Sequence, residues 1–170
     1  TNITNLNASN ISQGTVPVAR LPAEAIGGGK VLQVVSSFNN TFYSSNSTSY
    51  TDITNMNVTI TPTVSSSKIL ITFALGLVDD ASGSNGGYAF RMLRGSTAIA
   101  QGTGGSVNQN TGFIGQETNM FQFLDSPGTT NALTYKLQFK NTYNGNIRIN
   151  RTQDGQNSGA SSITAMEIGA

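Results

Sequence analysis

The sequence predicts an all-β fold, an antiparallel β-sandwich with enough strands for a jelly roll. Three observations predict it. Asn, Ser, Thr and Gly make up 78 of the 170 residues, which favours turns and wet strand faces. Short runs rich in Val, Ile, Phe and Tyr alternate with polar residues, as in half-buried strands. Between these runs there is no window with the apolar period of a helix.

Residues 1–29 differ from the rest and are expected to form a short extended stalk. Pro17, Pro22 and the Asn, Ser and Thr content oppose a helix, and three glycines close the segment. One copy cannot bury the isolated apolar residues, whereas three copies wound around an axis can point them inward. These trimer-interface candidates are Ile3, Leu6, Ile11, Val16, Val18 and Leu21. The alternative is a disordered leader ahead of a globular domain.

Residues 30–170 are expected to form the sandwich. The predicted strands are 30–36, 49–54, 56–63, 68–78, 88–94, 97–101, 119–125, 132–140, 146–151 and 161–168. A Pro-Gly pair marks the turn at 126–131, and a long polar loop fills 102–118. Asn144-Gly145 predicts a hairpin that pairs 132–140 with 146–151.

Two of these predicted strands indicate most clearly which of their faces are buried. In 132–140 apolar residues alternate strictly with polar ones, which indicates one core face and one wet face. Residues 68–78 are apolar on both faces, which indicates a central strand. Its second face, with Leu70, Ala74 and Val78, needs a further cover, either a neighbouring subunit or a loop of the same chain.

The composition excludes several function classes. The chain has no Cys and no His, so the usual ligands of zinc, haem, iron–sulfur and copper sites are missing, and we expect no metal and no cofactor. Ser–His–Asp and Cys–His catalysis both need an imidazole. A net charge of +1 with scattered basic residues argues against nucleic-acid binding. No run approaches 18 apolar residues, so we expect no membrane insertion.

The acidic residues do not suggest an active site either, and we expect that the protein is not an enzyme. Glycoside hydrolysis needs a pair of carboxylates that flank the substrate. Asp79 and Asp80 are adjacent in a predicted turn, and Asp125 precedes a Pro-Gly turn. Glu167 shares its strand face with Ile163 and is expected to be solvated, although an arginine could pair with it if this face is buried.

Several stretches resemble the distal, C-terminal domain of bacteriophage tail fibres. The opening NASNISQGTVPVARLP at 7–22 is similar to the stalk repeat of such fibres. The similar stretches of the body are VLQVVSS (31–37), VTITPTVSSSKILI (58–71), SPGTTNALTYKLQ (126–138), IRINR (147–151) and SSITAMEI (161–168). The resemblance implies a homotrimer at the fibre tip of a virion, with an intertwined stalk at 1–29 that joins the upstream fibre and a head at 30–170.

The resemblance also implies non-catalytic adhesion to a receptor on the bacterial surface, and we expect this receptor to be an envelope glycan. Sugars stack on aromatic rings and hydrogen-bond to amide and carboxylate groups. The candidate receptor-binding residues in the polar loops are Tyr143, Asn144, Phe113, Tyr88, Asp79 and Asp80; Tyr43 and Tyr50 are further aromatic candidates. Each aromatic ring has the alternative of packing within the sheets. Two other functions stay open: a structural trimerisation or capsid-decorating domain, and a hydrolase of surface polysaccharide.

Overall fold

The computed structural model describes residues 29–80, 86–107, 117–142, 146–151 and 158–169. Within them the chain forms ten β-strands and no helix. The described residues therefore contain no helix that is long and apolar enough to cross a membrane. The strands are β1 (Val31–Asn39), β2 (Tyr43–Ser45), β3 (Thr51–Ile60), β4 (Lys68–Asp80), β5 (Gly86–Arg94), β6 (Thr97–Val107), β7 (Glu117–Asp125), β8 (Leu133–Asn141), β9 (Ile147–Ile149) and β10 (Ser161–Ile168). All strand pairs are antiparallel, which confirms the predicted fold class.

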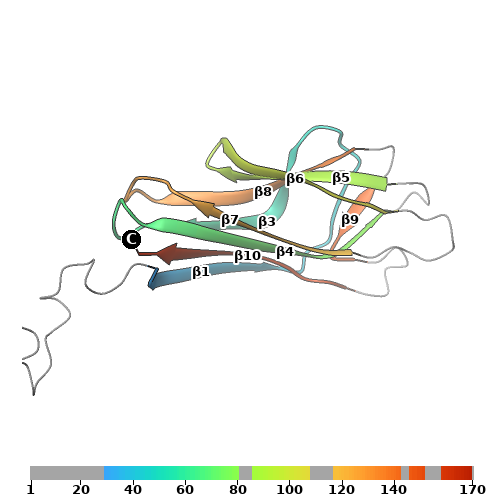
Figure 1. Ribbon diagram of the computed structural model, residues 1–170. Helices are drawn as coiled ribbons and strands as arrows, with labels where there is room; N and C mark the ends of the chain where they lie inside the picture. The colour runs from blue at the N-terminus through green and yellow to red at the C-terminus, as the bar shows by residue number, and fades with distance from the viewer. Residues whose placement is uncertain (1–28, 81–85, 108–116, 143–145, 152–157, 170) are drawn as a thin grey trace, which may run out of the picture.

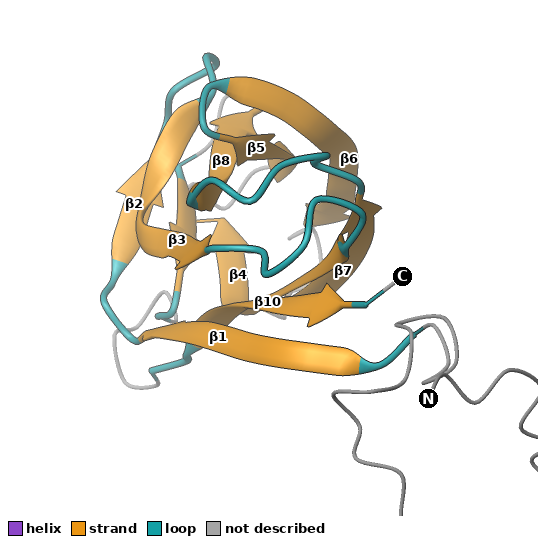
Figure 2. Ribbon diagram, turned by 90° about the vertical axis from the view of Figure 1, so that its left-hand side faces the viewer, coloured by secondary structure: helices purple, strands orange, loops and turns teal. Residues whose placement is uncertain are grey.

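The strands lie in two layers that face each other (Figure 1). One is a six-stranded sheet with the order β1-β10-β4-β9-β2, in which β7 also pairs with β4; the other is a four-stranded sheet with the order β3-β8-β5-β6. Taken without the short β2 and β9, the long strands have the order of a jelly roll, β1-β10-β4-β7 against β3-β8-β5-β6. Figure 2, turned by 90°, shows the two sheets curving around the space between them.

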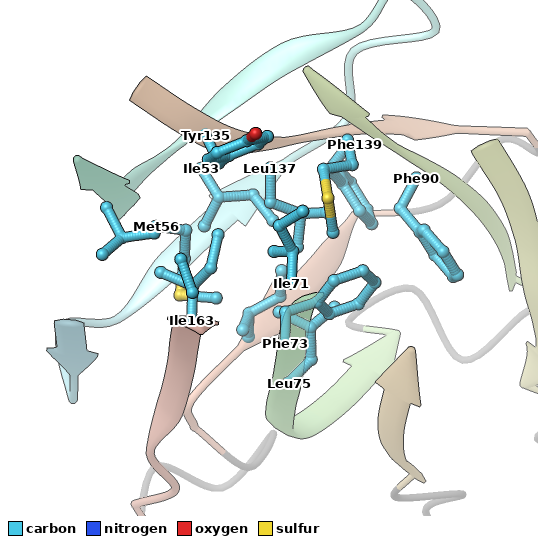
Figure 3. Packing of buried hydrophobic residues seen from close by; sticks show 14 of the residues in the cluster. Ile53, Met56, Ile71, Phe73, Leu75, Phe90, Tyr135, Leu137, Phe139 and Ile163 are labelled. Atoms are coloured by element: carbon cyan, nitrogen blue, oxygen red, sulfur yellow. The ribbon is translucent and has the colours of Figure 1, made fainter. Parts of the chain in front are cut away.

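The core fills that space with residues from alternate positions of the strands (Figure 3). Phe73 and Leu75 of β4 point from one sheet, and Leu137 and Phe139 of β8 from the other, and all four are fully buried. Phe73 meets Phe90 of β5 edge to face, with 5.1 Å between ring centroids. This packing accounts for the strict alternation in β8, whose burial pattern changes at every residue after Thr134.

Strand β4 changes partner at Gly76. Residues up to Ala74 pair with β10, whereas Val78 and the two residues after it pair with β9. The amide of Gly76 donates to Ser161 Oγ at 3.0 Å, and its carbonyl accepts from Asn150 N at 2.9 Å. A Cβ at this position would lie 2.2 Å from the backbone oxygen of Ala160, so only glycine fits.

We therefore expect Gly76→Ala to be strongly destabilising, because two backbones would have to separate. The expected loss is about 3 kcal/mol or more in the free energy of unfolding, measured by urea denaturation. Gly169→Ala is the matched control, since its Cβ would meet only the flexible side chain of Leu32 at 3.4 Å. Equal stability of the two variants would contradict the close approach.

The structure differs from the sequence-based prediction in several places. The two strands expected at 49–54 and 56–63 form a single strand, β3, whose register shifts around Asn55 with its φ of 62°. Strand β6 runs to Val107, into the expected loop. Val78 lies in the core and not on the outer face, because the irregularity between Leu75 and Val78 reverses the side on which it points.

The prediction that a hairpin at Asn144-Gly145 pairs 146–151 with 132–140 was wrong about the partner strand. Residues 144 and 145 lie outside the described residues, but β9 pairs with β2 and β4 in the six-stranded sheet. Strand β8 pairs with β3 along one edge and with β5 along the other. With both edges occupied, β8 cannot accept β9.

Candidate subunit interface

The outer face of the six-stranded sheet is the candidate functional surface. Directly opposed residues of antiparallel strands point to the same side of a sheet, so the register arranges side chains in rows across β1, β10, β4 and β7. These rows are Val31–Ile168–Lys68, Val34–Met166–Leu70–Leu124, Ser36–Thr164–Thr72–Gln122 and Phe38–Ser162–Ala74–Met120. They point away from the core, since the residues between them on β10 are buried. We call this surface the apolar face.

Large apolar side chains on the apolar face are open to solvent. Phe38 is 70% exposed and Met120 69%, while Val34 and Leu124, at the two ends of one row, are 54% and 49% exposed. Among the residues of the four rows, Lys68 alone is charged. The outer face of an antiparallel sheet is ordinarily polar. Large apolar side chains exposed on both sides of the one polar row, Ser36–Thr164–Thr72–Gln122, therefore indicate an interaction site.

The outer face of the four-stranded sheet has the opposite character. One row there consists of Asp52, Gln138, Arg91 and Gln101, and Lys136 lies opposite Asn57 in another. Lys136 Nζ pairs with Asp52 Oδ2 at 2.7 Å. The same chain therefore gives one sheet a charged outer face and the other an almost uncharged apolar one. This difference favours water on the first face and a protein surface on the second.

Leu70, Thr72 and Ala74 lie on the apolar face, as the doubly apolar pattern of residues 68–78 predicted. Sequence reasoning did not single out Phe38, Met120 or Leu124, because each is an isolated apolar residue on its own strand. Only the register of four strands brings them together. Alternation of outward-facing and inward-facing residues along 31–38 and 119–125, compared with that along 68–78, is the sequence signal that could have identified these three residues.

Glu167, expected on a wet face, is fully buried beside the loop that follows β3. Thr63 donates to Oε1 from its backbone N and from its hydroxyl, both at 2.7 Å, and Gln33 Nε2 donates to Oε2 at 2.6 Å. Burial alone would raise the pKa of Glu167, but these hydrogen bonds favour the charged form and lower the pKa to about 2. The nearby hydroxyl of Ser67 acts in the same direction without reaching hydrogen-bond geometry. The carboxylate fastens the β3–β4 loop to the six-stranded sheet.

Because the pKa of Glu167 falls on folding, its stabilising contribution is present above pH 4.5 and is lost as the pH falls through about 2. We expect this contribution to be on the order of 3 kcal/mol at neutral pH. The measurement is urea denaturation of the wild type and of Glu167→Gln between neutral and acid pH. The stability difference between them should shrink as the pH is lowered; a difference independent of pH would contradict the charged state.

Asp125, expected to be a turn residue, ends β7 as a buried carboxylate. Arg94 Nη1 donates to its two oxygens at 2.9 and 2.8 Å, and the hydroxyl of Tyr135 donates to Oδ2 at 2.7 Å. Burial, followed by this hydrogen bond, raises the pKa of Tyr135 well above its ordinary value. Arg94 and Tyr135 belong to the four-stranded sheet and Asp125 to the other, so the cluster ties the two layers together.

The predicted receptor-binding residues do not form one described site. Tyr88 is 1% exposed, and its ring stacks on Phe139 in the core while its hydroxyl accepts a hydrogen bond from Asn119. Tyr88 is therefore not a surface aromatic: its place on the inward side of β5 buries it. Tyr43 also packs against Phe139, at 6.2 Å between centroids.

Asp79 and Asp80, expected in a turn, lie in β4, where they oppose Arg148 and Ile147 of β9. The remaining receptor candidates, Tyr143, Asn144 and Phe113, lie outside the described residues. So do the six stalk candidates Ile3, Leu6, Ile11, Val16, Val18 and Leu21.

Three carboxylates, those of Asp52, Asp125 and Glu167, are engaged by other side chains or backbone groups. Asp52 binds Lys136 and Gln138, Asp125 binds Arg94 and Tyr135, and Glu167 binds Gln33 and Thr63. Among the described residues no group of three or more acidic side chains is placed to hold a metal ion.

No family model and no curated protein matches the chain. Among solved structures, the VP2 subviral particle of infectious bursal disease virus is similar at a TM-score of 0.44 and 11% identity, over 80% of this chain and 39% of that one. The T=1 particles derived from infectious bursal virus are similar at a TM-score of 0.40 and 12% identity, over 81% of this chain and 36% of that one. The chain thus spans little more than a third of the length of either protein. At these TM-scores and identities the likeness assigns the chain to no family.

Proposed function

We propose that this chain is the distal part of a bacteriophage tail fibre, a homotrimer that adheres to a receptor on the bacterial surface without catalysing a reaction. The observation that carries the assembly is the apolar face, with exposed Phe38, Met120, Val34 and Leu124 in an almost uncharged surface. Its occupant is a further copy of the same chain. An uncharged face can pack on a copy of the molecule without repulsion between like charges.

The position of the apolar face in the chain supports this occupant. Strand β1 begins at Val31, directly after the segment expected to wind three chains together. The stalk and the apolar face are thus contiguous in sequence, and three chains that meet in the stalk bring three copies of β1 close together. The tail-fibre resemblance of residues 7–22, which lie in that segment, supports the number three.

Adhesion is supported by composition and by the engaged carboxylates. An exterior rich in Asn, Ser and Thr but poor in charge suits hydrogen bonding to neutral and charged glycans alike. Three sites on each trimer, and several fibres on each virion, would convert weak single contacts into avidity. Asp52, Asp125 and Glu167 are held by protein donors, which disfavours a hydrolase built on these three acids.

The test is adsorption of the fluorescently labelled full chain to a panel of bacteria, together with release of reducing ends from their envelope polysaccharide. We expect saturable adsorption to at least one strain and no release. A trimer that adsorbs to none would favour the purely structural alternative, and release of reducing ends would favour the hydrolase.

A further inference from the structure

A cluster of cations around an aromatic ring lies on the outer face of the four-stranded sheet. Tyr50 precedes β3, with the guanidinium carbon of Arg91 4.2 Å from its ring centroid and Lys140 Nζ 4.9 Å from it. Gln138 and Asp52 continue the row from Arg91 toward β3. We call these five residues the Tyr50 site. We propose that the Tyr50 site binds an anionic saccharide, a sugar that carries a carboxylate or phosphate group. This inference rests on the proposed adhesive function and names the chemistry of its receptor.

The charges of the Tyr50 site are not balanced. Asp52 pairs with Lys136, at 2.7 Å between Nζ and Oδ2, and also faces the charge of Arg91, so one carboxylate stands against three cations, Lys136, Arg91 and Lys140. Arg91 and Lys140 form no ion pair with any carboxylate of the described residues, and both are held against the same ring. Two neighbouring cations repel each other, and an anion placed between them removes that repulsion. The missing charge is supplied by a ligand.

The site is also organised before any ligand arrives. Arg91 Nε donates to Gln138 Oε1 at 2.7 Å, and Gln138 Nε2 donates to Asp52 Oδ1 at 2.6 Å. The chain of hydrogen bonds and the contact with the Tyr50 ring fix the guanidinium, while its terminal nitrogens keep their donors for a ligand. Fixing the side chains in advance lowers the entropic cost of binding.

Polar groups beside the cations suit the rest of a sugar. The carboxylate of Asp52 can accept further hydrogen bonds from sugar hydroxyls, since its side chain is 52% exposed. Nucleic acid is a weaker candidate, because its affinity depends on many phosphate contacts and the site offers two unpaired cations on a chain of net charge +1. The site also lies on the sheet opposite the apolar face, so an assembly through that face leaves it open.

The test is isothermal titration of the full chain with three saccharides of similar size: a galacturonic acid oligomer, an oligosaccharide that carries mannose 6-phosphate, and a neutral malto-oligosaccharide. A duplex oligonucleotide is titrated as a fourth probe. We expect one or both anionic probes to bind more tightly than the neutral one, with affinity that falls as salt is added. The probe that binds distinguishes a carboxylate-bearing from a phosphate-bearing receptor.

Arg91→Gln and Lys140→Gln should each weaken binding of the anionic probe about tenfold. Lys30→Gln, which removes an exposed cation ahead of β1, is the matched control and should leave binding unchanged. Equal binding of acidic and neutral probes, equal loss in all three variants, no binding of either anionic probe, or tighter binding of a duplex oligonucleotide would each overturn the inference.

Adsorption of the same variants to bacteria separates this inference from the proposed function. If the wild type adsorbs and Arg91→Gln adsorbs equally well, the adhesive function stands and the Tyr50 site is wrong. If the wild type adsorbs to no bacterium, the adhesive function fails whatever the titration shows.

Discussion

Replacing Val34 and Leu124 together by Asp is expected to weaken the association of the assembled protein while each copy stays folded. These residues occupy the two ends of one row on the apolar face, on β1 and β7. Both side chains are about half exposed, so neither substitution opens the core. In an assembly each new carboxylate would be buried without a partner, at a cost of several kcal/mol. The measurement is sedimentation velocity, with circular dichroism to verify the fold.

The control places the same two charges on the other sheet. Thr59 of β3 and Thr97 of β6 are exposed strand residues of the four-stranded sheet, and Asp at both positions should leave the mass unchanged. If both double variants associate as tightly as the wild type, or if both are weakened equally, the apolar face is not the interface. If the first unfolds, the weaker variant Val34→Thr with Leu124→Thr tests the same contact through a lower association constant.

Removing the Glu167 side chain is expected to give the largest loss of stability among single substitutions of polar residues. Glu167→Ala removes a part-buried acceptor from three donors, namely the backbone N and the hydroxyl of Thr63 and the amide of Gln33, which keeps only its bond to the carbonyl of Thr61. Each unsatisfied buried donor costs about 1–3 kcal/mol, so we expect the free energy of unfolding to fall by about 3 kcal/mol or more. Urea denaturation of the purified variant measures it.

Glu167→Gln serves as the conservative control. It keeps the size of the side chain and one acceptor oxygen but not the charge, so it should lose less stability than Glu167→Ala at neutral pH. A change below about 0.5 kcal/mol in Glu167→Ala would show that the loop after β3 does not depend on this carboxylate.

Elements whose sequence pattern is regular were predictable from the sequence. The strand predicted at 161–168 coincides with β10, and that at 132–140 differs from β8 by one residue at each end. Both alternate without interruption, so one face packs inward whatever the rest of the chain does. Prediction failed where pairing decided the outcome. The Asn-Gly signal at 144–145 is local, whereas the pairing of β9 follows from the occupied edges of β8.

The candidate sites were predictable only in part, for the same reason. The second apolar face of residues 68–78 was visible, but its continuation onto Phe38 and Met120 required the register of neighbouring strands. The sequence predicts a solvated Glu167, because charged residues are seldom buried. Its donors, Thr63 and Gln33, lie 104 and 134 residues away in the chain, and no local sequence pattern indicates that they contact it.

The most direct test is the mass of the wild-type chain in solution, measured by sedimentation equilibrium over a range of concentrations. If copies of this chain cover the apolar face, the mass will be three times that of the 17.8 kDa chain and will persist on dilution. A mass of one chain at all concentrations would contradict the assembly, and the apolar face would then need another occupant.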